Sequence, residues 1–326
     1  MKRNKRYQLV FIILVFVVLL LMFLSTFTGS SDDSKVKLPG NVPNNITVLT
    51  NFILYKNESR QNIFGIKSDV VRNKMINART MEVVDVLSQN LNHNHIAEIH
   101  VLVEDQRTGD YLRRLGLKNA SKLTISVIAD TVTMKAQLEY AGNFLLDRVI
   151  AICHQDSLFG EGWQNLRPDI LKQNKIMYAL TRHTEEDSKC SSRSPSANCD
   201  PGYPYLGSHD VFLYHVKERF PEAALKLLDN VTPNLYGMEN LLIWMFRQKL
   251  GYIVLNPCRI LFVHHQHCVA IREKGRRRVD TALTKGVAPF TISLVPSGWK
   301  EVLQKAGMFL FILILFLYYF KFGFRK

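Results

Sequence analysis

The residues of this chain best placed for chemistry lie at the end of the segment 148–156. Most of this segment is apolar. The run reads Val-Ile-Ala-Ile-Cys and then changes abruptly to the polar triplet His154-Gln155-Asp156. In open α/β sheets, ligands bind outside the carboxyl ends of the strands, so a carboxylate at this position faces a substrate or an ion. Asp156 is therefore the first candidate for ligand binding. The alternative is that Asp156 merely caps the turn after the strand.

A second group of metal-binding side chains lies about a hundred residues further along. His264, His265 and His267 fall within four consecutive positions. Imidazole nitrogens are common metal ligands, so three histidines beside the predicted ligand crevice make this cluster a candidate metal site. The alternative is a partly exposed polar turn. A structural zinc site is not expected, because the chain has no Cys-x-x-Cys pair.

The elements that must position these residues alternate between strand and helix. Apolar runs predict strands, and apolar residues near helical spacing, such as Met81, Val84, Val86 and Leu87, predict helices. The expected strands are 45–55, 96–103, 123–128 and the run ending at 156, and the expected helices are 78–90, 110–115 and 134–146. Such a βαβ series predicts a mostly parallel sheet with helices on both faces and a ligand crevice at the strand ends.

The second half of the chain continues this pattern within the same predicted domain, 45–305. Strands are expected at 175–182 and 210–214, followed by an amphipathic helix at 239–250 and a strand with its turn at 251–258. The chain shows no repeat or low-complexity linker between 45 and 305 that would divide it in two.

Several motifs in this order resemble the Golgi-type nucleotide-sugar glycosyltransferases of the GT-A fold. They are the x-x-Asp triplet after an apolar strand, Ala179-Leu-Thr-Arg182, Gly207-Ser-His-Asp-Val-Phe212, Gly237-Met-Glu-Asn240, Gly251-Tyr-x-Val-x-Asn-Pro-Cys258 and His265-x-His267. The resemblance covers about 96–268. It implies an α/β, Rossmann-like GT-A catalytic domain. In that family the triplet is typically Asp-x-Asp, and here it is His154-Gln155-Asp156.

The resemblance also implies roles for individual residues. A Mn²⁺ or Mg²⁺ ion held by Asp156, His265 and His267 would stabilise the nucleoside diphosphate that leaves the sugar. His154 would contact the ion or the ribose. Arg182 would contact the nucleotide or position Asp156. Arg272, which belongs to a basic run, would neutralise the diphosphate, although such a run is more often a solvated face.

Two carboxylates in the resembling segments are the candidate catalytic residues. Glu239 begins the predicted helix 239–250, and it could serve as the base for the acceptor hydroxyl or hold the acceptor. The alternative is that Glu239 is simply an acidic residue favoured by the helix dipole. Asp210 is the second candidate, and its alternative role is to tie down the neighbouring loop.

Apolar segments near both ends predict membrane attachment. The uncharged stretch 9–27, preceded by a basic tail at 1–8, has the length of a transmembrane helix. The charge bias predicts a type II protein with a stem at 28–44 and a lumenal domain. A second apolar segment at 306–324 is expected to span the membrane or to lie in its interface. Sequons at Asn45, Asn57, Asn119 and Asn230 fit a Golgi or endoplasmic reticulum location.

Charge and cysteine content narrow the partners further. The net charge of +14 falls to +7 when the seven Lys and Arg flanking the apolar segments are set aside, which removes the main support for nucleic-acid binding. The remaining charge suits a phosphate-bearing substrate. We expect Cys190 to pair with Cys199 and Cys258 with Cys268, while Cys153 stays a buried thiol.

The sequence thus predicts a membrane-anchored glycosyltransferase that moves a sugar from a nucleotide donor to a glycan, protein or lipid acceptor. A catalytically inactive GT-A-like binding protein is the main alternative, because of the irregular triplet. A metal-dependent hydrolase is the third hypothesis, and it would use water as the acceptor.

Overall fold

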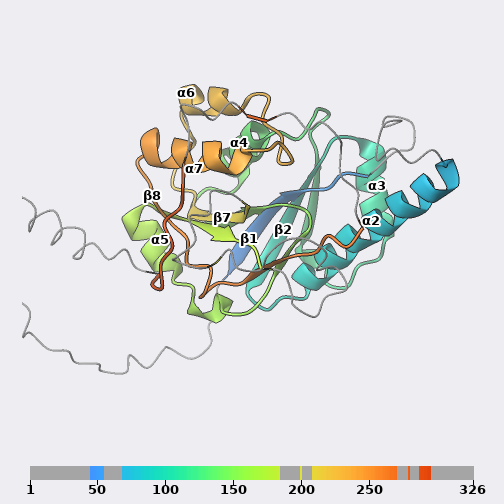
Figure 1. Ribbon diagram of the computed structural model, residues 1–326, viewed down its shortest axis with the longest axis horizontal. Coiled ribbons are helices and arrows are strands. Elements are labelled where there is room, and N and C mark those ends of the chain that lie inside the picture. Colours follow the sequence, from blue (N-terminus) through green and yellow to red (C-terminus); the bar gives the residue numbers. More distant parts are fainter. Residues whose placement is uncertain are drawn as a thin grey trace, which may run out of the picture. The chain divides into compact units, whose positions relative to one another are not determined.

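A mixed seven-stranded sheet forms the centre of the fold (Figure 1), with strand order β3-β2-β1-β4-β7-β6-β8. The computed structural model describes residues 45–54, 68–183, 199, 208–269, 278–279 and 286–294, all within one compact unit. The strands of this sheet are β1 (Ile46–Asn51), β2 (Ile96–Val103), β3 (Leu123–Val127), β4 (Val149–Cys153), β6 (Ile176–Thr181), β7 (His209–His215) and β8 (Ile253–Leu255).

The first four strands of this sheet are parallel, as the βαβ series predicts. β7 runs antiparallel to both of its neighbours, β4 and β6, and β6 is parallel to β8. A separate two-stranded antiparallel sheet joins β5 (Ser157–Phe159) to β9 (Val263–His265). The prediction of a mostly parallel α/β sheet is therefore confirmed.

Helices cover both faces of the large sheet. The α-helices are α2 (Asp69–Leu91), α3 (Gln106–Arg114), α4 (Met134–Phe144), α5 (Pro168–Asn174), α6 (Glu222–Leu225) and α7 (Met238–Gln248), with short 3₁₀ turns at η1 (Ala120–Lys122), η2 (Trp163–Asn165) and η4 (Lys226–Leu228). α2, α3 and α5 contribute to one hydrophobic core, and α4, α6 and α7 contribute to the other. Figure 1 shows α4, α6 and α7 grouped on one side of the strands.

The alternation of side chains along the strands explains these two cores. In β4, Val149, Ala151 and Cys153 belong to the core beneath α2, whereas Ile150 and Ile152 belong to the core beneath α7. Successive strand residues point to opposite faces, so a strand covered on both sides must be apolar throughout. This is why the run preceding His154 contains no polar residue.

Most predicted elements are present, with shifted ends. β2 has the predicted bounds, whereas β1 ends at Asn51 rather than at Tyr55. α2 begins at Asp69, well before the predicted position 78, because the Ser68 side chain caps the helix by accepting a hydrogen bond from the Val71 N–H. The expected place of Met81 in the apolar stripe is wrong, since this residue is 58% exposed.

The predicted membrane segments 9–27 and 306–324 and the stem 28–44 lie outside the described residues. Among the helices that the structure describes, none has the length and apolar character needed to span a bilayer. Of the four sequons, Asn57 lies outside the described residues, while Asn45, Asn119 and Asn230 are exposed.

Candidate functional site

The structure brings Asp156, His265 and His267 together, as the metal-site prediction requires. Asp156 lies in the turn between β4 and β5 rather than at the strand end itself. Ser157 pairs with His265 across the small sheet, and this pairing places the histidines beside Asp156. The Asp156 Oδ2 atom lies 3.3 Å from Nε2 of His265 and 3.6 Å from Nδ1 of His267.

The donor set of this triad fits a divalent ion. One ligand atom from each residue lies within 4.8 Å of the other two. Two donors bound about 2.1 Å from one ion are at most about 4.2 Å apart, so small side-chain rotations would suffice for coordination. Carboxylate oxygen and imidazole nitrogen are both common ligands of divalent metal ions.

Arg79 from α2 is a member of this site that the sequence did not reveal. Its side chain is only 2% exposed, and its Nη2 atom donates to Asp156 Oδ2. Burial by itself would raise the pKa of Asp156, but His265, His267 and Arg79 together hold this pKa well below its ordinary value. Asp156 is therefore ionised at neutral pH, as an ion ligand must be.

A second cluster adjoins the triad and contains the predicted catalytic residues. The Arg182 Nη1 atom lies 3.5 Å from Oδ2 of Asp210, which is only 2% exposed. The backbone N–H of His154 donates to the Asp210 carbonyl at 3.2 Å. His154, Asp210 and Arg182 all interact electrostatically with Glu239.

Topology explains why residues so distant in sequence meet here. β4 and β6 run in the same direction, so their carboxyl ends lie at the same edge of the sheet. His154 follows β4 and Arg182 follows β6 at this edge. β7 runs in the opposite direction, so its beginning, with Asp210, lies at the same edge. Glu239 occupies the first turn of α7, after Gly237 with a φ of 84°.

The environment of Glu239 suits a proton acceptor. Burial raises the pKa of Glu239, while His154 and Arg182 offset part of this rise. A carboxylate with a raised pKa is a stronger base once ionised. The helix-dipole role of Glu239 stays open as well, since it lies in the first turn of α7.

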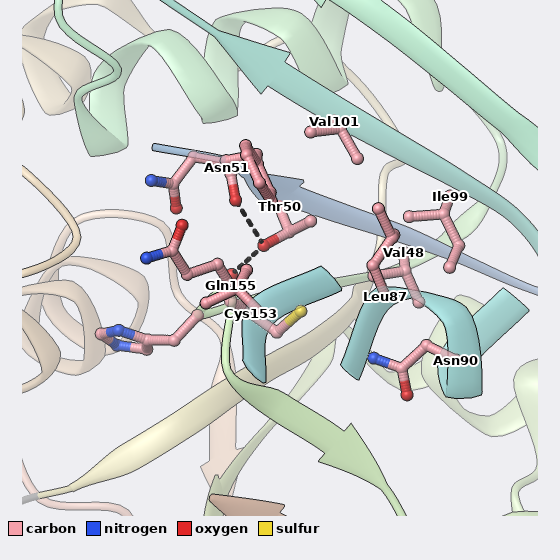
Figure 2. Close-up of a pocket in the computed structure, with 12 residues that line it drawn as sticks. Val48, Thr50, Asn51, Leu87, Asn90, Ile99, Val101, Cys153 and Gln155 are labelled. Atoms are coloured by element: carbon pink, nitrogen blue, oxygen red, sulfur yellow. Dashed lines mark hydrogen bonds between the residues drawn. The ribbon is translucent and has the colours of Figure 1, made fainter. Parts of the chain in front are cut away.

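Gln155, the middle residue of the triplet, has a structural role. Its side-chain oxygen accepts a hydrogen bond of 3.0 Å from the Ile53 N–H, just after β1. Nearby, the Thr50 hydroxyl donates to the Cys153 carbonyl at 2.9 Å (Figure 2). The adjoining cavity measures about 10 Å³, room for at most one water, so it is a packing feature and not a substrate site.

The cysteines differ from the prediction. Cys153 is the expected buried thiol, and burial raises its pKa to about 12. Cys258, however, pairs with Cys199, so both predicted disulfides are wrong. Cys268 is also disulfide-bonded. The backbone around Cys199 and Cys258 is held together locally, because Arg259 Nε donates to the Cys199 carbonyl at 2.9 Å.

Arg272, the predicted diphosphate contact, lies outside the described residues. The structure thus juxtaposes Asp156 with His265 and His267, and Glu239 with His154, Asp210 and Arg182. The contacts made by Arg79 were missed, because a single Arg within a helix gives no sign in the sequence that it is buried.

Comparisons with known proteins leave the family open. No protein-family model and no curated protein matches the chain. Similar solved structures include a protein assigned as a glucose-1-phosphate thymidylyltransferase from Bacillus anthracis, with 13% identity and a TM-score of 0.34 over 65% of this chain and 86% of that chain. HddC from Yersinia pseudotuberculosis has 11% identity and a TM-score of 0.31 over 54% of this chain and 80% of that chain. Likeness at this level carries no argument about function. The class that the structure itself defines is an α/β protein with a mostly parallel, helix-covered sheet and an Asp-His-His cluster.

Proposed function

We propose that this chain is a divalent-metal-dependent glycosyltransferase that uses a nucleotide-sugar donor. The observation that carries the proposal is the meeting of two chemically different clusters at one edge of the sheet. An Asp-His-His triad suited to Mn²⁺ adjoins a partly buried carboxylate whose pKa is raised. Sugar transfer from a nucleoside diphosphate needs a stabiliser for the departing phosphate, and direct displacement by an acceptor hydroxyl also needs a proton acceptor.

Each residue of the two clusters has a proposed role in the reaction. Asp156, His265 and His267 would hold the ion, which when bound neutralises charge on the nucleoside diphosphate. Glu239 accepts the proton of the acceptor hydroxyl as the acceptor oxygen bonds to the sugar carbon and the sugar–phosphate bond breaks. Arg182, which forms an ion pair with Asp210, is the proposed nucleotide contact. Arg272 is a further proposed phosphate contact.

The proposed acceptor is a glycan, protein or lipid, and the proposed location is the Golgi or endoplasmic reticulum membrane. This part rests on the apolar segments 9–27 and 306–324 and on the exposed sequons. Endoglycosidase treatment of the full chain from secretory cells should increase its electrophoretic mobility. Unchanged mobility of a chain made in such cells would contradict lumenal exposure.

One observation favours an inactive binding protein as the second candidate. The Asp156 Oδ2 atom, which would bind the ion, already accepts a hydrogen bond from the buried guanidinium of Arg79. Such a protein would bind the donor without turnover.

Release of nucleoside diphosphate from a panel of nucleotide sugars with Mn²⁺ separates these functions. We expect release from one donor in the presence of acceptor, and loss of release in Asp156→Ala. Asp169→Ala is the matched control, because Asp169 forms an exposed ion pair with Arg167 on α5. Binding without release would support the inactive protein, full-rate release without acceptor would indicate a hydrolase, and no binding would refute the assignment.

A further inference from the structure

One face of α2 carries polar side chains that reach into the candidate metal site. Arg79 and Glu82 are three residues apart, so both lie on the same side of the helix. Arg79 is 2% exposed and the Glu82 side chain is 16% exposed. Burying these charged groups is costly unless each is paired and hydrogen-bonded. Their partners therefore indicate what the pair does.

Arg79 connects three parts of the chain. In addition to its contact with Asp156, the guanidinium pairs with Glu82, and Nη1 lies 2.9 Å from Glu82 Oε2. The same Nη1 atom donates to the carbonyl of Gln266 at 2.9 Å. The planar guanidinium presents its donors in a fixed fork, which a lysine ammonium cannot reproduce. Arg79 thus fixes the Asp156 carboxylate relative to the backbone between the two triad histidines.

Glu82 holds the other side of the same turn. Its Oε1 atom accepts hydrogen bonds from the backbone N–H groups of Cys268 at 3.0 Å and Val269 at 2.8 Å. His267 lies between the carbonyl held by Arg79 and the N–H groups held by Glu82. The two α2 side chains therefore anchor the backbone on both sides of His267.

The charges of this group also favour an ion. The positive charge of Arg79 is shared between Glu82 and Asp156, so the three side chains together carry one net negative charge. Without Glu82, Arg79 would neutralise Asp156 fully and leave no net attraction for a cation.

We propose that Arg79 and Glu82 are positioning residues of the metal triad, which set the geometry of Asp156 and His267 and preserve the negative charge of the site. This inference rests on the proposed metal site. The competing explanation is that the pair only stabilises the fold.

Direct Mn²⁺ binding to the full chain tests the proposal without an activity assay. Free Mn²⁺ is measured by electron paramagnetic resonance during titration. We expect Arg79→Lys and Glu82→Gln each to weaken Mn²⁺ binding at least about tenfold, since loss of an outer partner of metal ligands typically costs 10–100-fold in affinity. Glu82→Gln is the milder change, because the amide oxygen can still accept the Cys268 and Val269 N–H groups.

Two control variants separate positioning from stability. Arg113→Lys alters an exposed Arg–Asp pair of the same spacing on α3 and should bind Mn²⁺ normally. Leu138→Ala creates a cavity in the opposite core, which destabilises the fold without touching the triad. If Leu138→Ala weakens binding as much as the two test variants do, or if the test variants bind like the wild type, the positioning role is refuted and the metal site stands. Failure of the wild type to bind Mn²⁺ would overturn both proposals.

Discussion

The side chain of Asn90 on α2 should contribute strongly to stability, because it completes the hydrogen bonding of β5. Asn90 is 5% exposed. Its Nδ2 atom donates to the Ser157 carbonyl at 2.9 Å, and its Oδ1 atom accepts from the Phe159 N–H at 3.1 Å. Asn90→Ala leaves both backbone groups buried without these partners. Each orphaned buried group costs about 1–3 kcal/mol, so we expect a loss of about 2–6 kcal/mol in the free energy of unfolding.

Denaturant titration of the wild type and Asn90→Ala measures this loss as a lower midpoint with an unchanged slope. Gln89→Ala is the control, because the neighbouring Gln89 is exposed and its side-chain amide donates to the exposed Asp85 at 2.8 Å. This control should change stability by no more than about 0.5 kcal/mol. Equal stability of the two variants would refute the idea that Asn90 holds β5.

Three further predictions concern the second cluster and the backbone. Glu239→Gln should slow nucleoside diphosphate release by about 10²–10⁴-fold in steady-state kinetics while donor binding persists, and a smaller fall would exclude Glu239 as the base. Burial lowers the pKa of His209 to about 4, whereas its value in the unfolded chain is near 6.5. The unfolded chain therefore binds this proton more readily, and the fold loses stability as the pH falls from about 6.5 towards 4. From pH 8 to pH 5 the wild type should lose about 2 kcal/mol more than His209→Gln in denaturant titrations, and parallel curves would contradict this. Gly162→Ala should lower the melting temperature far more than Gly116→Ala. Both glycines have positive φ, but only at Gly162 would a Cβ lie 1.7 Å from the Ile260 carbonyl oxygen. Equal shifts in melting temperature would disprove this steric explanation.

The centre of the large sheet was predictable, because β4 and most of β6 are apolar on both faces and therefore stand out as continuous runs. β2 was predicted with its observed bounds, 96–103. β5 and β9 were not predicted, since three residues are too few to show a periodicity. Their pairing is what brings His265 to Asp156. The resemblance to glycosyltransferases therefore indicated the metal triad, but no local pattern indicated how it forms.

The errors have equally specific causes. Met81 was assigned to the apolar stripe of its helix, but polar Arg79 and Glu82 occupy part of the buried face. A single sequence does not show that these polar residues are buried, because the partners of Arg79, at residues 156 and 266, are far from it in the sequence. The disulfide error arose because connectivity cannot be deduced from spacing alone.

The candidate metal site joins the large sheet to the small two-stranded sheet. Asp156 follows a central strand, whereas His265 ends a three-residue strand of a sheet too small to be stable alone. Contacts outside that sheet hold the second part, including the bond of 3.0 Å from Trp163 Nε1 to the Phe262 carbonyl. Local opening of β9 should therefore require less free energy than global unfolding. A bound ion would link both parts and oppose this opening, so Mn²⁺ should slow amide exchange at 263–269 more than in the large sheet.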